Sequence, residues 1–258
     1  MGSIRHTKTY PNSPPKHYGM IDEIGNWMNS LTAKLTGTFG ERLIFAGLQG
    51  SYLRGEATRD SDIDVMVVLD HLDTADLALY RTLVSGMPEG EKACGFICGK
   101  EELAAWPKYE LFQLAKETKG WYGNLAELLP PVARSDLADS VRIAAANLYH
   151  EVCHRYLYDT GEDRVENLQY AYKSAFFLLK LVHYLRTYEY ICTKTKLLPE
   201  LKDTEREILL VSLHWNEQRN LRRENPDGYY QMMLAWSGGL LKEMKNAEPE
   251  IRITVQAQ

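Results

Sequence analysis

The fold is decided by residues 48–69, LQGSYLRGEATRDSDIDVMVVL. The apolar start of this stretch runs into a turn at Gly50-Ser51, and a polar connector follows. Two aspartates, Asp62 and Asp64, then lead into an apolar run that is typical of a buried strand. Because residues i and i+2 of a strand point to the same face, Asp62 and Asp64 are expected to project together.

Two carboxylates side by side repel each other unless a cation lies between them. Mg²⁺ prefers oxygen ligands and is usually held by one or two carboxylates together with substrate phosphates. The turn upstream supplies backbone N–H groups and a hydroxyl that can meet phosphate oxygens. The stretch therefore predicts metal-assisted nucleotidyl transfer.

The pattern Gly50-Ser51, then a short connector, then Ser61-Asp62-Ile63-Asp64 resembles the signature of the DNA polymerase β-like nucleotidyltransferase superfamily. Within it, the chain resembles the small bacterial enzymes that modify antibiotics, such as kanamycin and streptomycin nucleotidyltransferases. The resemblance covers roughly the first 100 residues and combines a turn, a gap and a strand.

This resemblance implies that Asp62 and Asp64 are metal ligands for Mg²⁺, with two ions present once the nucleotide is bound. It implies that Gly50 and Ser51 contact the nucleoside triphosphate, with ATP as the expected donor. The connector adds side chains that either touch phosphate or are simply solvated: Arg54, Thr58, Arg59 and Ser61.

The family normally adds a third carboxylate from the next strand, which completes the metal site or serves as the base for the acceptor hydroxyl. The corresponding strand here, Lys92–Cys98, contains no carboxylate. Glu91 lies just before it, and Glu101 and Glu102 lie just after it. We therefore expect the base to be Glu91 or Glu102, to come from the helical half of the chain, or to be absent.

Composition limits the class of protein. The 258 residues carry a net charge of −5, which argues against a general nucleic-acid surface. The four cysteines form no disulfide or zinc pattern, and neither a secretory signal nor a membrane-spanning run is evident. The expectation is a reduced, cytoplasmic protein, monomeric or homodimeric, with small-molecule partners and no contact with nucleic acid or membrane.

Three segments are expected along the chain. Residues 1–19 form a polar arm, residues 20–129 an α/β nucleotidyltransferase domain with a small mixed sheet and flanking helices, and residues 130–258 an all-α bundle. Pro130-Pro131 marks the boundary between the last two. Apolar periodicity predicts four long helices in the bundle: Asp136–Leu157, Val165–Ile191, Thr204–Arg222 and Pro226–Met244.

The helical half carries further candidate residues. By resemblance this half closes the cleft over the substrates, and Lys173, beside Tyr172, would then pair with triphosphate; the alternative is a lysine that reaches solvent from the helix edge. His150, Cys153 and His154 have helical spacing that suits zinc, but a buried cysteine between two surface histidines is the favoured interpretation. The aromatic residues are expected to be mostly core, with a few lining an acceptor pocket: Tyr156, Tyr158, Tyr170, Tyr172, Phe176, Phe177, Tyr184, Tyr188 and Tyr190.

The leading hypothesis is a Mg²⁺-dependent nucleotidyltransferase that moves AMP from ATP to a hydroxyl of a small molecule and releases pyrophosphate. By resemblance the acceptor is an aminoglycoside-like antibiotic. Two alternatives stay open: a nucleotide-binding protein without catalysis, and an antitoxin-type enzyme that adenylylates a partner protein. Binding of Mg²⁺-ATP without pyrophosphate release would favour the first alternative. A partner protein that co-purifies with the chain would favour the second.

Overall fold

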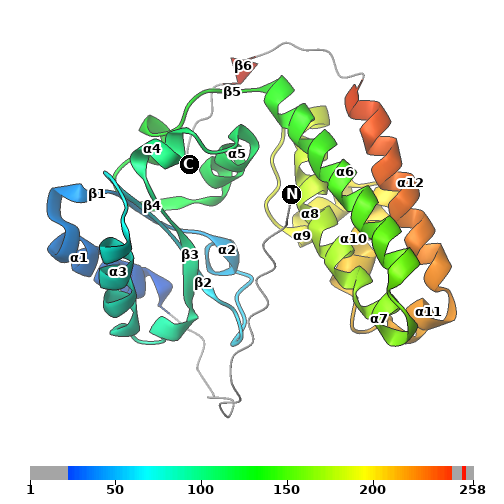
Figure 1. Ribbon diagram of the computed structural model, residues 1–258, viewed down its shortest axis with the longest axis horizontal. Helices are drawn as coiled ribbons and strands as arrows, with labels where there is room; N and C mark the ends of the chain where they lie inside the picture. Colours follow the sequence, from blue (N-terminus) through cyan, green and yellow to red (C-terminus); the bar gives the residue numbers. More distant parts are fainter. Residues whose placement is uncertain (1–22, 246–251, 254–258) are drawn as a thin grey trace.

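A four-stranded sheet with flanking helices lies beside a bundle of helices in the computed structural model, which describes residues 23–245 and 252–253 (Figure 1). The expected arm at residues 1–19 lies outside the described residues. The two-part fold predicted from the sequence, a small mixed sheet followed by a helical half, is confirmed.

The sheet has the strand order β3-β2-β1-β4. Strands β2 and β3 run parallel, whereas β1 pairs antiparallel with both β2 and β4. The strands are β1 (Leu43–Leu48), β2 (Ile63–Leu69), β3 (Ala93–Gly99) and β4 (Lys119–Tyr122). Three of them follow the sequence, in which the apolar runs Leu43–Leu48, Ile63–Leu69 and Lys92–Cys98 predict strands. Strand β4 was not predicted, because a short edge strand that begins Lys-Gly and is half exposed carries little apolar signal.

Alternation along β2 decides which layer each residue meets. Ile63, Val65 and Val67 pack against α1 (Ile24–Phe39) and α3 (Thr74–Ser85) on one face of the sheet. Met66 and Val68 point the other way, into a core shared with α4 (Lys100–Ala104) and α5 (Lys108–Glu117). By the same alternation Asp64 faces the side of α4 and α5.

Helix α5 belongs to both halves of the molecule. Its Leu111 is buried in the core under the sheet, whereas the next residue, Phe112, is buried in the core of the bundle. Pro107 separates α5 from α4, as expected for a residue that cannot continue a helix. The division at residue 129 stays a prediction, since the packing of α5 crosses it.

The bundle is less regular than predicted. Two of the expected long helices are broken: the second splits into α7 and α8 and ends at Thr187, where Tyr188 takes a left-handed conformation, and the third splits into α10 and α11. Strand β5 pairs with the C-terminal strand β6. The elements are α6 (Arg134–Tyr158), α7 (Gly161–Glu166), α8 (Leu168–Thr187), α9 (Lys194–Leu197), α10 (Asp203–Leu213), α11 (Arg219–Glu224), α12 (Pro226–Lys245), β5 (Val132–Ala133) and β6 (Arg252–Ile253).

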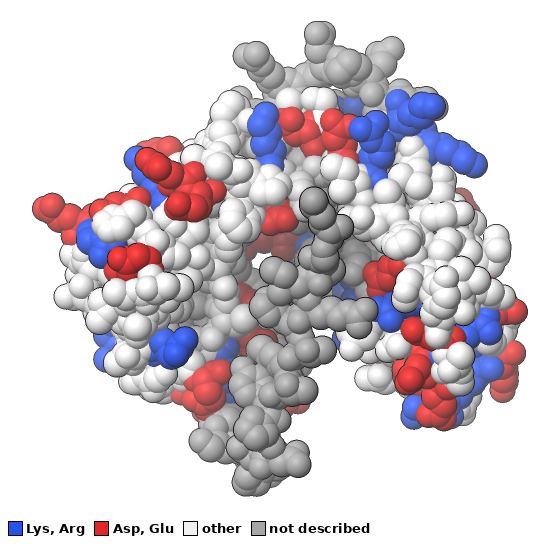
Figure 2. Space-filling model, in the orientation of Figure 1, with Lys and Arg blue, Asp and Glu red and all other residues white. Residues whose placement is uncertain are grey.

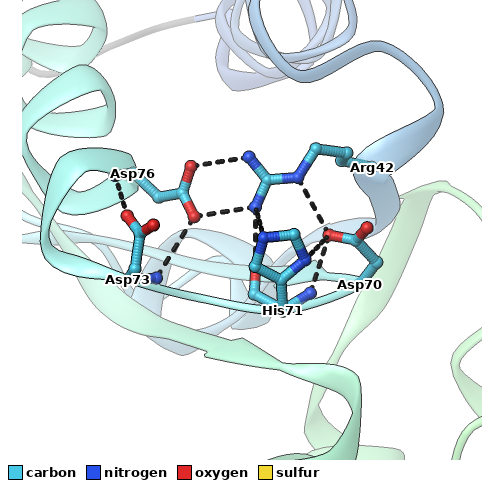
Figure 3. A network of polar contacts seen from close by, with 5 residues as sticks. All are labelled: Arg42, Asp70, His71, Asp73 and Asp76. Carbon is cyan, nitrogen blue, oxygen red and sulfur yellow. Dashed lines mark hydrogen bonds and ion pairs between the residues drawn. The ribbon is translucent and has the colours of Figure 1, made fainter.

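A polar network locks the end of the sheet where β1 begins and β2 ends (Figure 3). Arg42 donates from its two terminal nitrogens to both carboxylate oxygens of Asp76, each at 2.8 Å, and from Nε to Asp70 at 3.0 Å. Asp73 and Asp76 also form a capping box at the start of α3. This network fixes α3 against the sheet at the end opposite to Asp64.

The surface visible in Figure 2 mixes Lys and Arg with Asp and Glu and shows no continuous basic stripe among the coloured residues. No helix in the described part of the chain is long and apolar enough to cross a membrane.

Candidate active site

The turn after β1 brings the backbone against Asp64. Gly50 is the first residue of the one-turn helix α2 (Gly50–Arg54) and has a φ of 68°, in the left-handed region that favours glycine. A Cβ at this position would lie 1.8 Å from Asp64 Oδ2. The Gln49 N–H also donates to the Asp64 carbonyl oxygen at 2.8 Å. The predicted Gly-Ser turn is therefore in contact with the second aspartate.

The negative charges of Asp62 and Asp64 repel each other. Asp62 is exposed just before β2, and Asp64 is half-buried. Burial raises the pKa of the Asp64 carboxyl above its ordinary value; the charge of Asp62 raises it further, and Arg54 opposes the shift. A divalent cation between the two carboxylates would relieve this repulsion, so the pair fits Mg²⁺.

Protein ligands beyond this pair do not gather around it. In the described residues no three His, Cys, Asp or Glu side chains are grouped to hold a metal.

The connector before Asp62 is held by hydrogen bonds within itself. The Thr58 N–H donates to Ser61 Oγ at 2.9 Å, and the Ser61 N–H donates to the Thr58 carbonyl at 3.1 Å. Lys92, nearly buried, donates to the Arg59 carbonyl at 2.9 Å. Ser61 thus shapes the turn that presents Asp62.

A cavity of about 480 Å³ opens between the sheet and the bundle. The sheet side contributes Gln49, Gly50, Arg54, Asp64 and Phe96, and the bundle contributes Phe177. The remaining lining comes from α5 and the turn before it: Trp106, Tyr109, Glu110, Gln113, Leu114 and Glu117. Three carboxylates, one from the sheet and two from α5, therefore face one cavity.

Glu117 joins the two halves of the molecule at the floor of this cavity. It accepts hydrogen bonds from Lys180 Nζ and from the Tyr190 hydroxyl, and it lies 3.7 Å from Arg54. Lys180 is only 1 % exposed, and burial lowers the pKa of its amine while Glu117 opposes that shift. Burial beside Glu117 also raises the pKa of Tyr190, which stays a hydroxyl donor.

Positive charge gathers on the bundle side near Arg54. Burial lowers the pKa of Lys194, Glu56 opposes the shift, and the neighbouring charges of Lys173 and Arg54 lower it further. Lys173 itself is exposed, and it has no ion-pair partner within residues 23–245. The sequence singled out Lys173, but not Lys180 or Lys194.

The strand position expected to carry the third carboxylate is occupied by other side chains. Cys94 is the in-register partner of Asp64, and Phe96 lines the cavity two residues further on. Phe96 packs edge-on against Trp106, with ring centroids 5.0 Å apart. The carboxylate that does reach the cavity near this wall is Glu110, from α5.

The two candidates for the third carboxylate lie at opposite ends of β3. Glu91 is exposed in the turn before β3, at the same end of the sheet as Asp62. Glu102 lies on α4 beyond Gly99, the residue in register with Leu69. The structure thus places Glu91 at the same end of β3 as the two aspartates and Glu102 at the opposite end.

The remaining candidates of the helical half take surface positions. His150 and His154 are exposed, and Cys153 between them is half-buried rather than buried. Tyr172 is buried and donates its hydroxyl to the Tyr229 carbonyl at 3.0 Å, so it faces the bundle and not the cavity.

The expectation that the aromatic series is mostly core is wrong, because five of its nine members are exposed. An aromatic residue at nearly every turn cannot place every ring on one helix face, so several rings lie outside. The exposed members are Tyr156, Tyr158, Tyr170, Phe177 and Tyr188.

Comparisons with known proteins agree with the fold. Residues 39–120 match the family model described as a nucleotidyltransferase domain. No curated protein sequence matches the chain. A solved structure of spectinomycin adenyltransferase AAD(9) from Enterococcus faecialis, with ATP and spectinomycin, superposes with a TM-score of 0.54 at 16 % identity. The match covers 84 % of this chain and 99 % of that one, so the fold extends over both halves.

Proposed function

We propose that this chain, whose residues 39–120 match a nucleotidyltransferase domain, is an enzyme that transfers AMP from ATP to a hydroxyl of a small molecule with release of pyrophosphate. One observation carries the proposal: Asp64, two residues after Asp62, lies against Gly50 and lines a cavity between the sheet and the bundle. In this proposal the reaction depends on Mg²⁺.

Positioning and charge neutralisation are the main tasks in such a transfer. Asp62 and Asp64 would hold Mg²⁺, which when bound neutralises the phosphates and orients them. Gly50 lets the backbone N–H groups of α2 approach the phosphates, and Ser51 adds a hydroxyl. Arg54, Lys173 and Lys194 supply positive charge around the same region, which supports a triphosphate there.

The base for the acceptor hydroxyl is proposed to be Glu110. Of the three carboxylates that line the cavity, Asp64 belongs to the metal pair and Glu117 is neutralised by Lys180 and Arg54. Glu110 accepts from Trp106 Nε1 at 2.5 Å and from the Tyr109 hydroxyl at 2.8 Å, and both donors are neutral.

These two hydrogen bonds hold the Glu110 carboxyl in place on α5. In the proposed step the acceptor oxygen bonds to the α-phosphorus, its proton passes to Glu110, and the bond to pyrophosphate breaks. This assignment favours catalysis over nucleotide binding without catalysis, because a carboxylate from α5 stands in for the one that β3 lacks.

The acceptor is proposed to be an antibiotic-like small molecule. The neighbouring structure was solved with ATP and spectinomycin, which supports ATP as donor and a hydroxylated antibiotic as acceptor. The mixed charge of the visible surface supports a small-molecule partner over nucleic acid. A cytoplasmic location and a monomer or homodimer complete the proposal. No observation favours the protein-adenylylating alternative.

The test is pyrophosphate release from Mg²⁺-ATP in the presence of a panel of aminoglycosides and lincosamides. Release with one acceptor, lost in Asp64→Asn, is the expected result, since that variant keeps the shape but removes the charge that holds the metal. Binding of Mg²⁺-ATP with no release for any acceptor would overturn the catalytic proposal.

A further inference from the structure

A second cavity, of about 260 Å³, lies in the groove between α5, α6 and α8. Most of the side chains around it are apolar. They come from all three helices: Tyr109, Ala144, Leu148, Phe177, Leu178 and Leu181. We call this space the α6–α8 pocket. An apolar cavity that is open at the surface is a site for an apolar group of a ligand.

The α6–α8 pocket offers no free charge. Its only charged lining residue is Glu151, which accepts from Arg155 Nε at 2.8 Å one helical turn away. The hydroxyl of Ser140 donates to the Asp136 carbonyl at 2.6 Å and is thereby occupied. A charged group placed here would lose its hydration without gaining a partner, whereas a neutral group would not.

The α6–α8 pocket adjoins the cavity that holds Asp64. Tyr109, Gln113 and Phe177 line both spaces. Tyr109 also donates to Glu110, so the wall between the two spaces carries the proposed base. A ligand whose hydroxyl lies at Glu110 therefore has the α6–α8 pocket within immediate reach.

Phe177 marks the junction. Its side chain is 54 % exposed although it stands where the two cavities meet. A large exposed ring at such a place carries unburied apolar surface, at a cost of roughly 25 cal/mol per Å² that a bound apolar group would remove. Its exposure is understandable if a ligand covers it.

We propose that the α6–α8 pocket is the subsite for a neutral, apolar portion of the acceptor. The inference rests on the proposed function and narrows its substrate class. The acceptor is an alcohol with an uncharged apolar substituent, which lies on Phe177 between α6 and α8 while the reacting hydroxyl faces Glu110. Polycationic acceptors, whose charges would be unpaired in this pocket, are excluded from this subsite.

A homologous series of methyl, butyl, hexyl and octyl β-D-glucosides tests the subsite by calorimetric binding below the micelle concentration. These probes share one neutral, hydroxylated head group and differ only in the apolar tail. Affinity is expected to rise roughly fourfold per methylene until the pocket is filled. Affinity that does not change with tail length overturns the proposal.

Two variants of α6 test whether the alkyl tail of the glucoside binds in the α6–α8 pocket. Ala144→Phe fills the α6–α8 pocket and is expected to abolish the dependence on tail length. Ala146→Phe adds the same ring at an exposed position of the same helix, outside the pocket, and is the matched control. If the affinity depends on tail length equally in both variants, the tail binds elsewhere and the proposal is overturned. Ser174→Leu, on α8, replaces Ala144→Phe if that variant does not fold.

Paramagnetic relaxation by Mn²⁺, which shares the oxygen-ligand preference of Mg²⁺, reports the orientation. With ATP and Mn²⁺ present, the sugar protons of the bound glucoside should relax faster than the terminal methyl protons. The reverse order overturns the proposal. A third result is an affinity that rises with tail length while Mn²⁺ affects the relaxation of no glucoside proton. That result supports the subsite and contradicts the metal site of the proposed function.

Discussion

Because Gly50 has no side chain, the carboxylate of Asp64 can lie against the backbone turn. The φ of 68° and the 1.8 Å approach to Asp64 leave no room for a side chain. Sequence reasoning identified Gly50, Asp62 and Asp64 from their order and spacing alone, because local pattern determines where these residues lie.

Replacing Gly50 by alanine should abolish transfer and lower the free energy of unfolding by about 1–2 kcal/mol, the cost of left-handed backbone with a Cβ. Gly25→Ala is the control: this helical glycine has nothing within 4 Å of an added Cβ, and the change should stabilise α1 by about 0.5–1 kcal/mol. Thermal unfolding and pyrophosphate release measure both effects. Full activity in Gly50→Ala would contradict the close approach.

Changing Glu110 to glutamine should lower kcat by about 10²–10⁴-fold and leave the KM for ATP unchanged, because the base is lost while the nucleotide contacts remain. Steady-state kinetics with a saturating acceptor measure this change. Glu102→Gln, at the far end of β3, and Glu91→Gln serve as matched controls with near-normal turnover. A large loss of kcat in Glu91→Gln, with none in Glu110→Gln, would contradict this assignment and identify Glu91 as the base.

At the scale of elements, the strands β1 to β3 were predictable because each is a continuous apolar run. The helices α1 and α3 were predictable because apolar residues recur at helical spacing in residues 20–38 and 73–85. The sequence did not show where α8 and α10 end. Aromatic residues such as Tyr188 and Trp215 continue past the last residue of each helix, so the predicted helices were too long. Glu110 and Glu117 were missed for another reason: they lie on α5, and only tertiary packing shows that α5 faces Asp64.

The junction between α5 and α8 should be sensitive to single substitutions. Lys180→Met is expected to lower the free energy of unfolding by about 3 kcal/mol, because Glu117 loses its nearest cation and hydrogen-bond donor. The double variant Lys180→Met, Glu117→Gln should recover part of that loss, as measured by urea unfolding. Breaking the exposed pair Lys108–Asp136 should cost less than about 1 kcal/mol. No recovery in the double variant would contradict the pairing.

The attachment of α3 to the sheet should weaken in acid. Hydrogen bonds from Arg42 hold the pKa of Asp76 below its ordinary value of 3.8. The ion pair therefore stabilises the fold fully above that value and loses its effect as the pH falls through the lower folded-state pKa. Asp76→Asn should reduce the melting temperature at neutral pH, and the difference from the native chain should shrink in acid. Asp139→Asn, in an exposed helical pair, should show no such trend.

At the scale of the whole molecule, the cavity exists only because the sheet and the bundle meet along α5 (Figure 1). The sequence predicted two halves and a site at the start of β2. It did not predict which bundle side chains close the site, because Phe177, Lys180 and Lys194 lie on helices whose rotation is set by packing. In the proposed function, the sheet presents the two aspartates that would hold the metal, and α5 and the bundle line the acceptor side of the cavity.

The fate of labelled phosphate tests the central claim most directly. With ATP labelled at the α-phosphate, the label should appear on the acceptor, and label placed at the γ-phosphate should appear only in pyrophosphate. The same label on the acceptor should vanish in Asp64→Asn. Transfer of the γ-label to the acceptor, or of no label with any acceptor tested, would contradict the account of this chain as a nucleotidyltransferase.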